Sequence, residues 1–209
     1  MTVSDTEKEA LLGRIREHRA GVIDDEKRLH CAVCIPIIRT EDGFDILFEV
    51  RSGKIPAQPG DVCLPGGRME PGETPLQTAV RETCEELRIR PQQLEPVGEA
   101  DVLREGNVVL RPFAAILSDY GGSFSTEEVA EVFRVPLSFF LETEPDTYTF
   151  PMTYELPENF PFDRIVGGRK YAWRQSLHEA MFYEYEGWTI WGFTARVMRA
   201  FAVMLSRPE

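Results

Sequence analysis

Three glutamates on one predicted helix are the residues whose types and spacing most clearly indicate chemistry. Glu82, Glu85 and Glu86 stand at positions i, i+3 and i+4, so an α-helix places their carboxylates on one side. Like charges at this spacing destabilise a helix by about 0.2–0.5 kcal/mol per pair unless a cation offsets the repulsion. Mg²⁺ and Mn²⁺ prefer such oxygen ligands and, when bound, activate water and polarise phosphoryl groups. The alternative is a solvated acidic face that binds nothing.

Glycines and two further charged residues near that helix favour the metal-binding interpretation. Gly66 and Gly67 lie shortly before it, and without side chains they allow a tight loop that can approach a phosphate closely. Glu73 stands just before the helix and Arg81 stands within it. Together with the three glutamates, these residues indicate a site for a divalent metal and a phosphorylated ligand.

The helix that carries the glutamates has clear start and stop signals. Thr74 is a favourable N-cap, Pro75 suits the first helical position, and Gln77 completes a capping box. We expect the helix to continue until Pro91 stops it. The side opposite the glutamates should pack against the rest of the protein. It comprises Leu76, Ala79, Val80, Thr83, Cys84 and Leu87.

The remaining pattern predicts a mixed α+β domain. An apolar stripe predicts a helix over about residues 4–21, and an Asp-Gly pair at 42–43 predicts a hairpin. Strands are expected near residues 30–39, 44–51, 94–103, 108–117 and 130–135, a short helix near 136, strands and loops over 144–188, and a last helix over about 189–205. The mixed order is typical of helices layered on a sheet. We therefore expect a single domain, residues 29–209, with an N-terminal helical extension over 1–28.

Composition and charge exclude several classes of protein. The 209 residues include 35 acidic and 23 basic side chains, a net charge of −12, whereas a nucleic-acid-binding surface should be basic. The chain has neither a signal-peptide pattern nor an apolar run of about 20 residues, so we expect no membrane partner and a cytoplasmic location. Cys31 and Cys34 lie three apart in a predicted strand, which directs them to opposite faces and argues against a shared metal.

The spacing of the charged residues resembles the Nudix box, the signature of hydrolases that act on nucleoside diphosphates linked to another moiety. Gly67 is followed after five residues by Glu73 and after seven more by the sequence Arg-Glu-Thr-Cys-Glu-Glu, residues 81–86. Two positions differ from the box. Arg88 stands where the box has a glycine, and Thr83 stands where it prefers an aliphatic residue.

The resemblance implies a Nudix-type α/β/α sandwich, with a mixed central sheet, one catalytic helix, and N- and C-terminal helices. It implies Mg²⁺ or Mn²⁺ as the cofactor, with Glu82, Glu85 and Glu86 as metal ligands. It also implies an ion pair between Glu73 and Arg81 that braces the loop against the helix. The alternative is that these two residues form an ordinary surface ion pair. We count Glu73, Arg81, Glu82 and Glu85 among the catalytic residues.

A catalytic base is expected outside the box. In proteins of this fold a second acidic residue often comes from a later loop, and residues 125–131 contain suitable glutamates. We expect Glu128 to be the base, with Glu127 as the second choice. The alternative is that these glutamates only begin a helix or a turn.

The region before the box is similar to that of the coenzyme A pyrophosphatases of the Nudix family. Arg51, Ser52 and Gly60 match the spacing of that subfamily's additional motif, although Leu64 replaces a phenylalanine and Pro56 a basic residue. We expect Arg51, Ser52, Gly66 and Gly67 to bind the substrate, since a guanidinium can hold a phosphate by two hydrogen bonds. More than half of the aromatic residues lie in residues 148–191, which could stack on a base, form core or line a dimer interface.

The resemblance therefore implies hydrolysis of coenzyme A or an acyl-coenzyme A to 3′,5′-ADP and (acyl)phosphopantetheine. One alternative substrate is ADP-ribose, another nucleotide sugar or a dinucleotide. An alternative of another class is a non-catalytic nucleotide sensor. In each case the partner is a small diphosphate and not a nucleic acid, and the choice between a monomer and a homodimer stays open.

Overall fold

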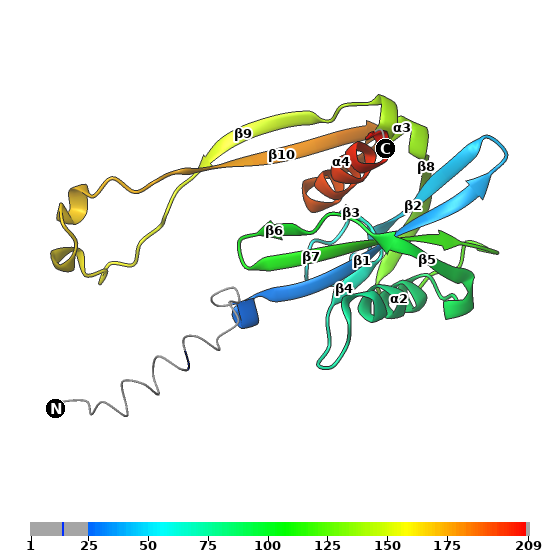
Figure 1. Ribbon diagram of the computed structural model, residues 1–209, viewed down its shortest axis with the longest axis horizontal. Coiled ribbons are helices and arrows are strands. Elements are labelled where there is room, and N and C mark those ends of the chain that lie inside the picture. The colour runs from blue at the N-terminus through cyan, green and yellow to red at the C-terminus, as the bar shows by residue number, and fades with distance from the viewer. Residues whose placement is uncertain (1–13, 15–24, 208–209) are drawn as a thin grey trace.

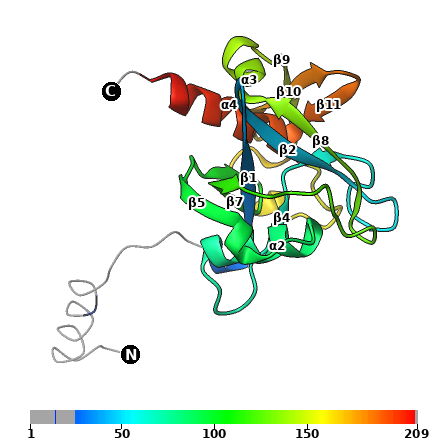
Figure 2. The ribbon, with the colours of Figure 1, turned by 90° about the vertical axis from the view of Figure 1, so that its right-hand side faces the viewer.

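A mixed eight-stranded sheet lies between helix α2 on one face and helices α3 and α4 on the other (Figures 1 and 2). The computed structural model describes residue 14 and residues 25–207. The sheet contains β1 (Leu29–Thr40), β2 (Gly43–Arg51), β3 (Val62–Cys63), β4 (Gly66–Arg68), β5 (Leu94–Glu99), β6 (Leu103–Glu105), β7 (Val108–Leu117) and β8 (Val129–Pro136). The α-helices are α2 (Pro75–Glu86), α3 (Leu137–Glu142) and α4 (Gly192–Ser206). This arrangement confirms the predicted α/β/α sandwich.

Strand β1 is the centre of the sheet. It pairs antiparallel with β2 through the predicted hairpin and parallel with β7 along most of its length. Cys34 lies in the core cluster that packs under α2, whereas Cys31 packs against the cluster under α4. The prediction that the two cysteines point to opposite faces is therefore confirmed, and both are free thiols.

Helix α2 begins as the sequence predicts and ends earlier. Thr74 and Gln77 form the capping box, with Pro75 in the first turn. The helix ends at Glu86 rather than at Pro91, because Arg88 adopts a left-handed conformation with φ +52°. Pro91 instead begins a short 3₁₀ helix, Pro91–Gln93. Arg88 thus has the backbone conformation that explains why the Nudix box has a glycine at this position.

Two other predicted boundaries need correction. The predicted strand over 94–103 is divided, because β5 ends at Glu99 and pairing with β7 resumes at Leu103 in β6. The last helix begins at Gly192 rather than Thr189, because Thr189 pairs with Glu184 in a strand.

A second sheet of three strands extends from the α4 side of the protein (Figure 1). It comprises β9 (Asp146–Met152), β10 (Ser176–Tyr185) and β11 (Trp188–Trp191). Short 3₁₀ helices, Phe162–Arg164 and Gly168–Lys170, lie in the long connection between β9 and β10, and another, Asp25–Lys27, precedes β1. Residues from all three strands line the cavity described below.

Two sequence predictions concern regions at the edge of the described structure. Apart from residue 14, the predicted helix over residues 4–21, and with it most of the proposed extension 1–28, lies outside the described residues. Within the described residues, none of the helices has the length and apolar character needed to cross a membrane.

Candidate active site

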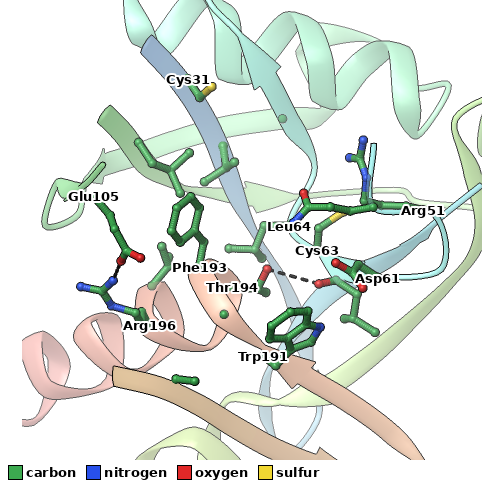
Figure 3. Close-up of a pocket in the computed structure, with 18 of the residues that line it drawn as sticks. Cys31, Arg51, Asp61, Cys63, Leu64, Glu105, Trp191, Phe193, Thr194 and Arg196 are labelled. Carbon is green, nitrogen blue, oxygen red and sulfur yellow. Dashed lines mark hydrogen bonds and ion pairs between the residues drawn. The ribbon is translucent and has the colours of Figure 1, made fainter. Parts of the chain in front are cut away.

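A cavity of about 390 Å³ lies on the α4 side of the sheet, and three of the predicted substrate-binding residues line it: Arg51, Gly66 and Gly67 (Figure 3). Arg51 ends β2, where its Nε donates to the carbonyl oxygen of Ala57 at 3.1 Å. The fourth predicted residue, Ser52, is buried outside the lining, and its hydroxyl accepts a hydrogen bond from the Lys54 amide. Ser52 therefore makes a hydrogen bond within its own loop and is not among the residues that line the cavity.

The two glycines make close contact with the protein itself. A side chain at Gly66, where φ is +149°, would lie 2.4 Å from the carbonyl oxygen of Ala32 in β1. A side chain at Gly67 would lie 2.5 Å from the carboxylate of Glu82. From the sequence, both glycines are expected to allow the loop to approach a phosphate. Their observed use is to let β4 approach β1 and to leave room for the Glu82 carboxylate beside the backbone.

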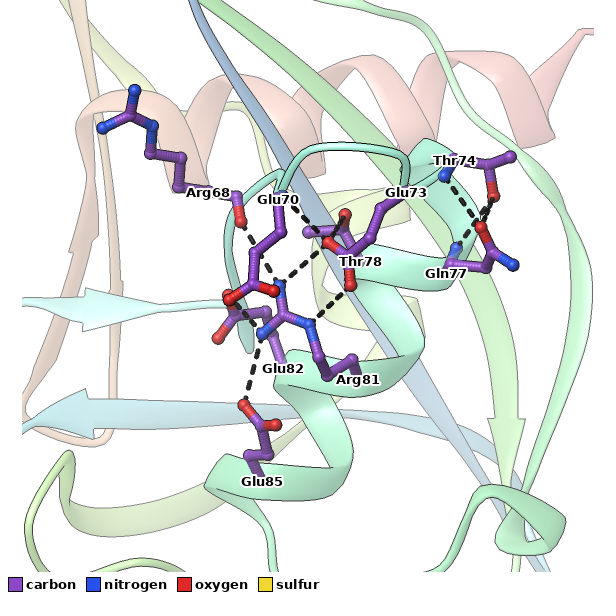
Figure 4. Close-up of polar contacts among 9 residues, drawn as sticks. All are labelled: Arg68, Glu70, Glu73, Thr74, Gln77, Thr78, Arg81, Glu82 and Glu85. Carbon is purple, nitrogen blue, oxygen red and sulfur yellow. Dashed lines mark hydrogen bonds and ion pairs between the residues drawn. The ribbon is translucent and has the colours of Figure 1, made fainter.

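Glu73 and Arg81 form the predicted brace (Figure 4). Arg81 donates from Nε to Glu73 Oε1 at 2.7 Å and from a terminal nitrogen to Oε2 at 3.0 Å. The Glu70 amide and the Thr78 hydroxyl also donate to Glu73 Oε2. The hydrogen bonds from Arg81, Glu70 and Thr78 lower the pKa of Glu73 to about 2. Glu73 is therefore a fixed anion that ties the loop to α2.

Arg81 also contacts two of the predicted metal ligands. Its guanidinium lies 2.9 Å from Glu82 Oε1 and 3.3 Å from Glu85 Oε2. The Glu85 side chain is mostly exposed, whereas that of Glu82 is largely covered. Burial raises the pKa of Glu82, and the hydrogen bond from Arg81 opposes this effect. One guanidinium thus holds the carboxylates of the loop and the helix together.

Glu86 is buried, which corrects the prediction that all three glutamates occupy a face opposite to the packing side. The buried residues of α2 are Thr78, Ala79, Thr83 and Glu86, whereas Leu76 and Val80 are only half-buried. Glu86 Oε2 accepts a hydrogen bond from the Gly66 amide at 2.8 Å. Burial, and next the nearby charge of Glu49, raise the pKa of Glu86 well above its usual range.

Glu49 is a site residue that the sequence analysis missed. It lies on β2, is only 1% exposed, and its Oε2 has no hydrogen-bond partner among the described residues. The Cys63 thiol donates to its other oxygen at 3.4 Å. Burial raises the pKa of Glu49, as it does for Glu86. The available signal was a single charge inside the apolar run Ile46–Val50, since an unpaired carboxylate is costly to bury.

Carboxylate oxygens such as these are the ligands that Mg²⁺ and Mn²⁺ prefer. The buried, unpartnered oxygen of Glu49 beside Glu86 calls for positive charge, and the space at Gly67 admits the Glu82 carboxylate. In the side-chain positions observed for the described residues, no three Asp, Glu, His or Cys side chains form a metal-binding group. The assignment of Glu82, Glu85 and Glu86 as ligands therefore stays a prediction.

The structure separates the two predicted base candidates. Glu127 points to Lys54 and lies 2.8 Å from its Nζ. The charge of Glu128 instead raises the pKa of Glu49, Glu82 and Glu86, so its carboxylate lies near theirs. The Ser52 amide donates to the Glu128 carbonyl oxygen at 2.8 Å and fixes this turn. Glu128 is therefore within electrostatic range of the carboxylate cluster.

The far end of the cavity contains an ion cluster that the sequence did not indicate. Glu105 of β6 contacts Arg196 of α4 (Figure 3). The Nδ1 of His178 on β10 lies 2.9 Å from Glu105. Of the aromatic residues in 148–191, Phe150 and Trp191 line the cavity, whereas Tyr183 is buried in the core. This segment thus contributes both cavity wall and core.

Residues 28–151 match the NUDIX domain, and the chain belongs to the Nudix family. The resemblance identified from the box is thereby confirmed. The family match includes every predicted site residue from Arg51 to Glu128, and it ends before β10, β11 and α4, which complete the cavity.

Three relatives illustrate the range of similarity. The chain is 33% identical to the peroxisomal coenzyme A diphosphatase NUDT7 of Mus musculus over 116 residues, which is 54% of this chain and 49% of that protein. It is 31% identical to Nudix hydrolase 3 of Caenorhabditis elegans over 58% of this chain and 53% of that one. The uncharacterized Nudix hydrolase NudL of Photorhabdus laumondii is 28% identical over 86% of both chains. The chain therefore spans about half the length of the first two relatives.

Proposed function

We propose that this protein hydrolyses the diphosphate bridge of coenzyme A or an acyl-coenzyme A with the help of Mg²⁺ or Mn²⁺. The products are 3′,5′-ADP and (acyl)phosphopantetheine. The observation that carries the proposal is the buried Glu49 carboxylate, with one unpartnered oxygen, beside Glu86 and near Glu82 and Glu128. Such a concentration of buried negative charge is costly unless a cation balances it.

The chain supplies the ligands for that cation. Glu82, Glu85 and Glu86 would hold it, and Glu49 adds negative charge from the neighbouring strand. When bound, the ion polarises a phosphoryl oxygen and compensates the charge of the diphosphate. The Glu73–Arg81 brace keeps the loop and α2 in register, so that the carboxylates stay in position.

The remaining residues supply proton transfer and substrate binding. Glu128 accepts the proton of the attacking water as its oxygen bonds to phosphorus, and the bridging P–O bond breaks on the opposite side. Arg51 binds a phosphate oxygen at the cavity, where its charge suits an anionic substrate despite the acidic overall composition. The choice of coenzyme A is supported by the resemblance at Arg51, Ser52 and Gly60 and by the name of the mouse relative.

A panel of diphosphates tests the proposal directly. The full chain would be incubated with coenzyme A, acetyl-coenzyme A, ADP-ribose, NADH and a diadenosine polyphosphate, each with Mg²⁺, Mn²⁺ or EDTA, and the products identified by mass spectrometry. We expect phosphopantetheine and 3′,5′-ADP as the major products, formed only with metal. Faster turnover of ADP-ribose or of a dinucleotide would identify that compound as the substrate of the same type of reaction. Binding without any turnover would indicate a sensor.

Reaction in ¹⁸O-labelled water identifies the phosphorus that is attacked. The label enters the product that retains this phosphorus, either phosphopantetheine or 3′,5′-ADP. The Glu86→Gln variant serves as the matched inactive control. The predicted cytoplasmic location and the question of a homodimer require separate measurements, such as cell fractionation and the molar mass in solution.

A further inference from the structure

We propose that the cavity on the α4 side of the sheet binds the uncharged arm of the substrate, and that the nucleotide half lies outside it. For coenzyme A this arm is the pantetheine chain. The inference rests on the proposed function, since it assigns the two halves of that substrate to different places. It goes beyond that function because it names the residues that select the arm.

The cavity directly adjoins the carboxylate cluster. Cys63 lines the cavity and donates its thiol hydrogen bond to Glu49. Gly67 lines it as well, and a Cβ at this position would lie 2.5 Å from the Glu82 carboxylate. The charge of Glu82 contributes to the raised pKa of a third lining residue, Cys31, for which burial is the main cause. A diphosphate at the cluster would therefore have one of its two substituents at the entrance of the cavity.

The walls of the cavity are mainly apolar. Its sides are formed by Val33, Leu64, Leu110, Phe193 and Val197. The volume of about 390 Å³ lies within the range of small-molecule sites, roughly 300–1,000 Å³. A branched aliphatic chain buries its carbon atoms favourably against such walls, whereas a phosphorylated ribose does not.

The charges at the far end disfavour a phosphate. Arg196, the cation at that end, is already paired with Glu105, which also binds His178. The 3′-phosphate of the nucleotide half would therefore meet the Glu105 carboxylate and a guanidinium whose charge that carboxylate already balances. The same polar groups can accept and donate hydrogen bonds to the amides of an uncharged arm.

A matched pair of tryptophan variants on β10 tests this assignment. Ala180 lines the cavity, so Ala180→Trp fills it from the strand. Leu177 lies on the same strand, is 72% exposed and is not part of the lining, so Leu177→Trp is the control. Titration calorimetry of the full chain would measure the binding of phosphopantetheine and of 3′,5′-ADP with Mg²⁺ present.

We expect Ala180→Trp to weaken phosphopantetheine binding by about tenfold or more while 3′,5′-ADP binding changes less than about twofold, because only the arm loses buried contact area. Leu177→Trp should change neither. If Ala180→Trp proves unfolded by circular dichroism, Phe193→Ala provides the same test, since this 37%-exposed ring is a wall of the cavity and its removal should also weaken the arm selectively.

The contrary outcomes are distinct. Selective weakening of 3′,5′-ADP binding would show that the nucleotide occupies the cavity, and unchanged binding of both ligands would show that neither half does. Either result overturns the inference. Coenzyme A turnover by the unaltered chain would still support the proposed function. Conversely, Ala180→Trp could weaken phosphopantetheine binding although the unaltered chain does not hydrolyse coenzyme A. This combination would refute the proposed reaction and support the cavity assignment.

Discussion

Arg81 donates two hydrogen bonds to Glu73 across the junction between the glycine loop and helix α2 (Figure 4). The same guanidinium lies 2.9 Å from Glu82, so the loop carboxylate and a predicted metal ligand share one cation. The pair is more than an ordinary surface ion pair, because Thr78 and the Glu70 amide complete the hydrogen bonding of Glu73. We regard Glu73 and Arg81 as positioning residues in the proposed reaction.

The first prediction is that Glu73→Gln lowers kcat by about 10–100-fold, as is usual when the support of a metal ligand is removed. The glutamine keeps the size of the side chain and loses the charge that holds Arg81. Glu70→Gln is the matched control, since Glu70 hydrogen bonds to Glu73 through its backbone amide and carbonyl groups. Steady-state kinetics at saturating Mg²⁺ would measure the effect, and equal rates for the two variants would exclude a positioning role.

The brace also has a defined pH dependence. The pKa of Glu73 falls from 4.5 to about 2 on folding, so its contribution to stability is fully present above the unfolded value and is lost as the pH falls towards 2. The difference in the free energy of unfolding between the unaltered chain and Glu73→Gln should therefore be constant at neutral pH and shrink below about pH 4.5. Urea unfolding at a series of pH values would measure it.

The box and its helix could be predicted because the relevant signals are local. Thr74, Pro75 and Gln77 fix the start of α2, and the spacing of Glu73 and Arg81 fixes their pairing. The orientation of the helix could not be predicted from hydrophobicity. Thr78 and Thr83 are buried because their hydroxyls bond to Glu73 and to the Ala79 carbonyl, and this rotation turns Glu86 towards the sheet.

The cavity could not be predicted because its parts are distant in sequence. Glu105, His178 and Arg196 come from three elements, and only the pairing of β6 with β7 and the packing of α4 bring them together. In the same way Glu49 meets Glu86 because α2 packs against β1, the strand that pairs with β2. Long-range contacts of this kind leave no periodic signal in the chain.

The second prediction concerns Arg88, which stands where the box has a glycine. Its φ of +52° is strained for an L-residue, by about 1–2 kcal/mol, and glycine relieves that strain at some cost in chain entropy. We expect Arg88→Gly to raise the free energy of unfolding by about 0.5–1 kcal/mol. Arg90, with φ −92°, is the matched control, and Arg90→Gly should destabilise the protein. Urea unfolding of both variants would test this, and the opposite order would contradict it.

The third prediction compares adjacent glutamates. Glu128→Gln should lower kcat by about 10²–10⁴-fold, the usual contribution of a general base. Glu127→Gln should leave kcat nearly unchanged, because Glu127 is paired with Lys54. Single-turnover kinetics with Mg²⁺ would separate the chemical step from product release. If Glu127→Gln proves the slower enzyme, the assignment of the base is reversed.

The fourth prediction is that Arg51→Ala weakens coenzyme A more than ADP-ribose. Arg51 lines the cavity assigned to the arm, so loss of its contact with the phosphate that carries the arm should raise KM for coenzyme A by about tenfold, and for ADP-ribose, which has no such arm, by less. Arg39→Ala on the neighbouring strand is the control, since Arg39 lies over the Phe44 ring outside the cavity. The two substrates would be compared by KM under the same conditions. An equal increase in KM for both substrates would show that Arg51 does not favour coenzyme A.

The fifth prediction follows from the burial of two carboxylates side by side. Without metal, Glu49→Gln replaces one of two buried carboxyl groups, whose ionisation burial disfavours, by a neutral amide, so Tm should rise by about 2–4 °C, the shift that roughly 1 kcal/mol produces in a domain of this size. Mg²⁺ should raise the Tm of the unaltered chain and raise that of Glu49→Gln less, because the variant offers the ion less negative charge. Glu131→Gln, at an exposed position on β8 opposite Val50, should match the unaltered chain in both conditions. Calorimetric melts with EDTA and with Mg²⁺ would measure both shifts, and a Tm gain from Mg²⁺ that is equal in all three proteins would exclude Glu49 from the metal site.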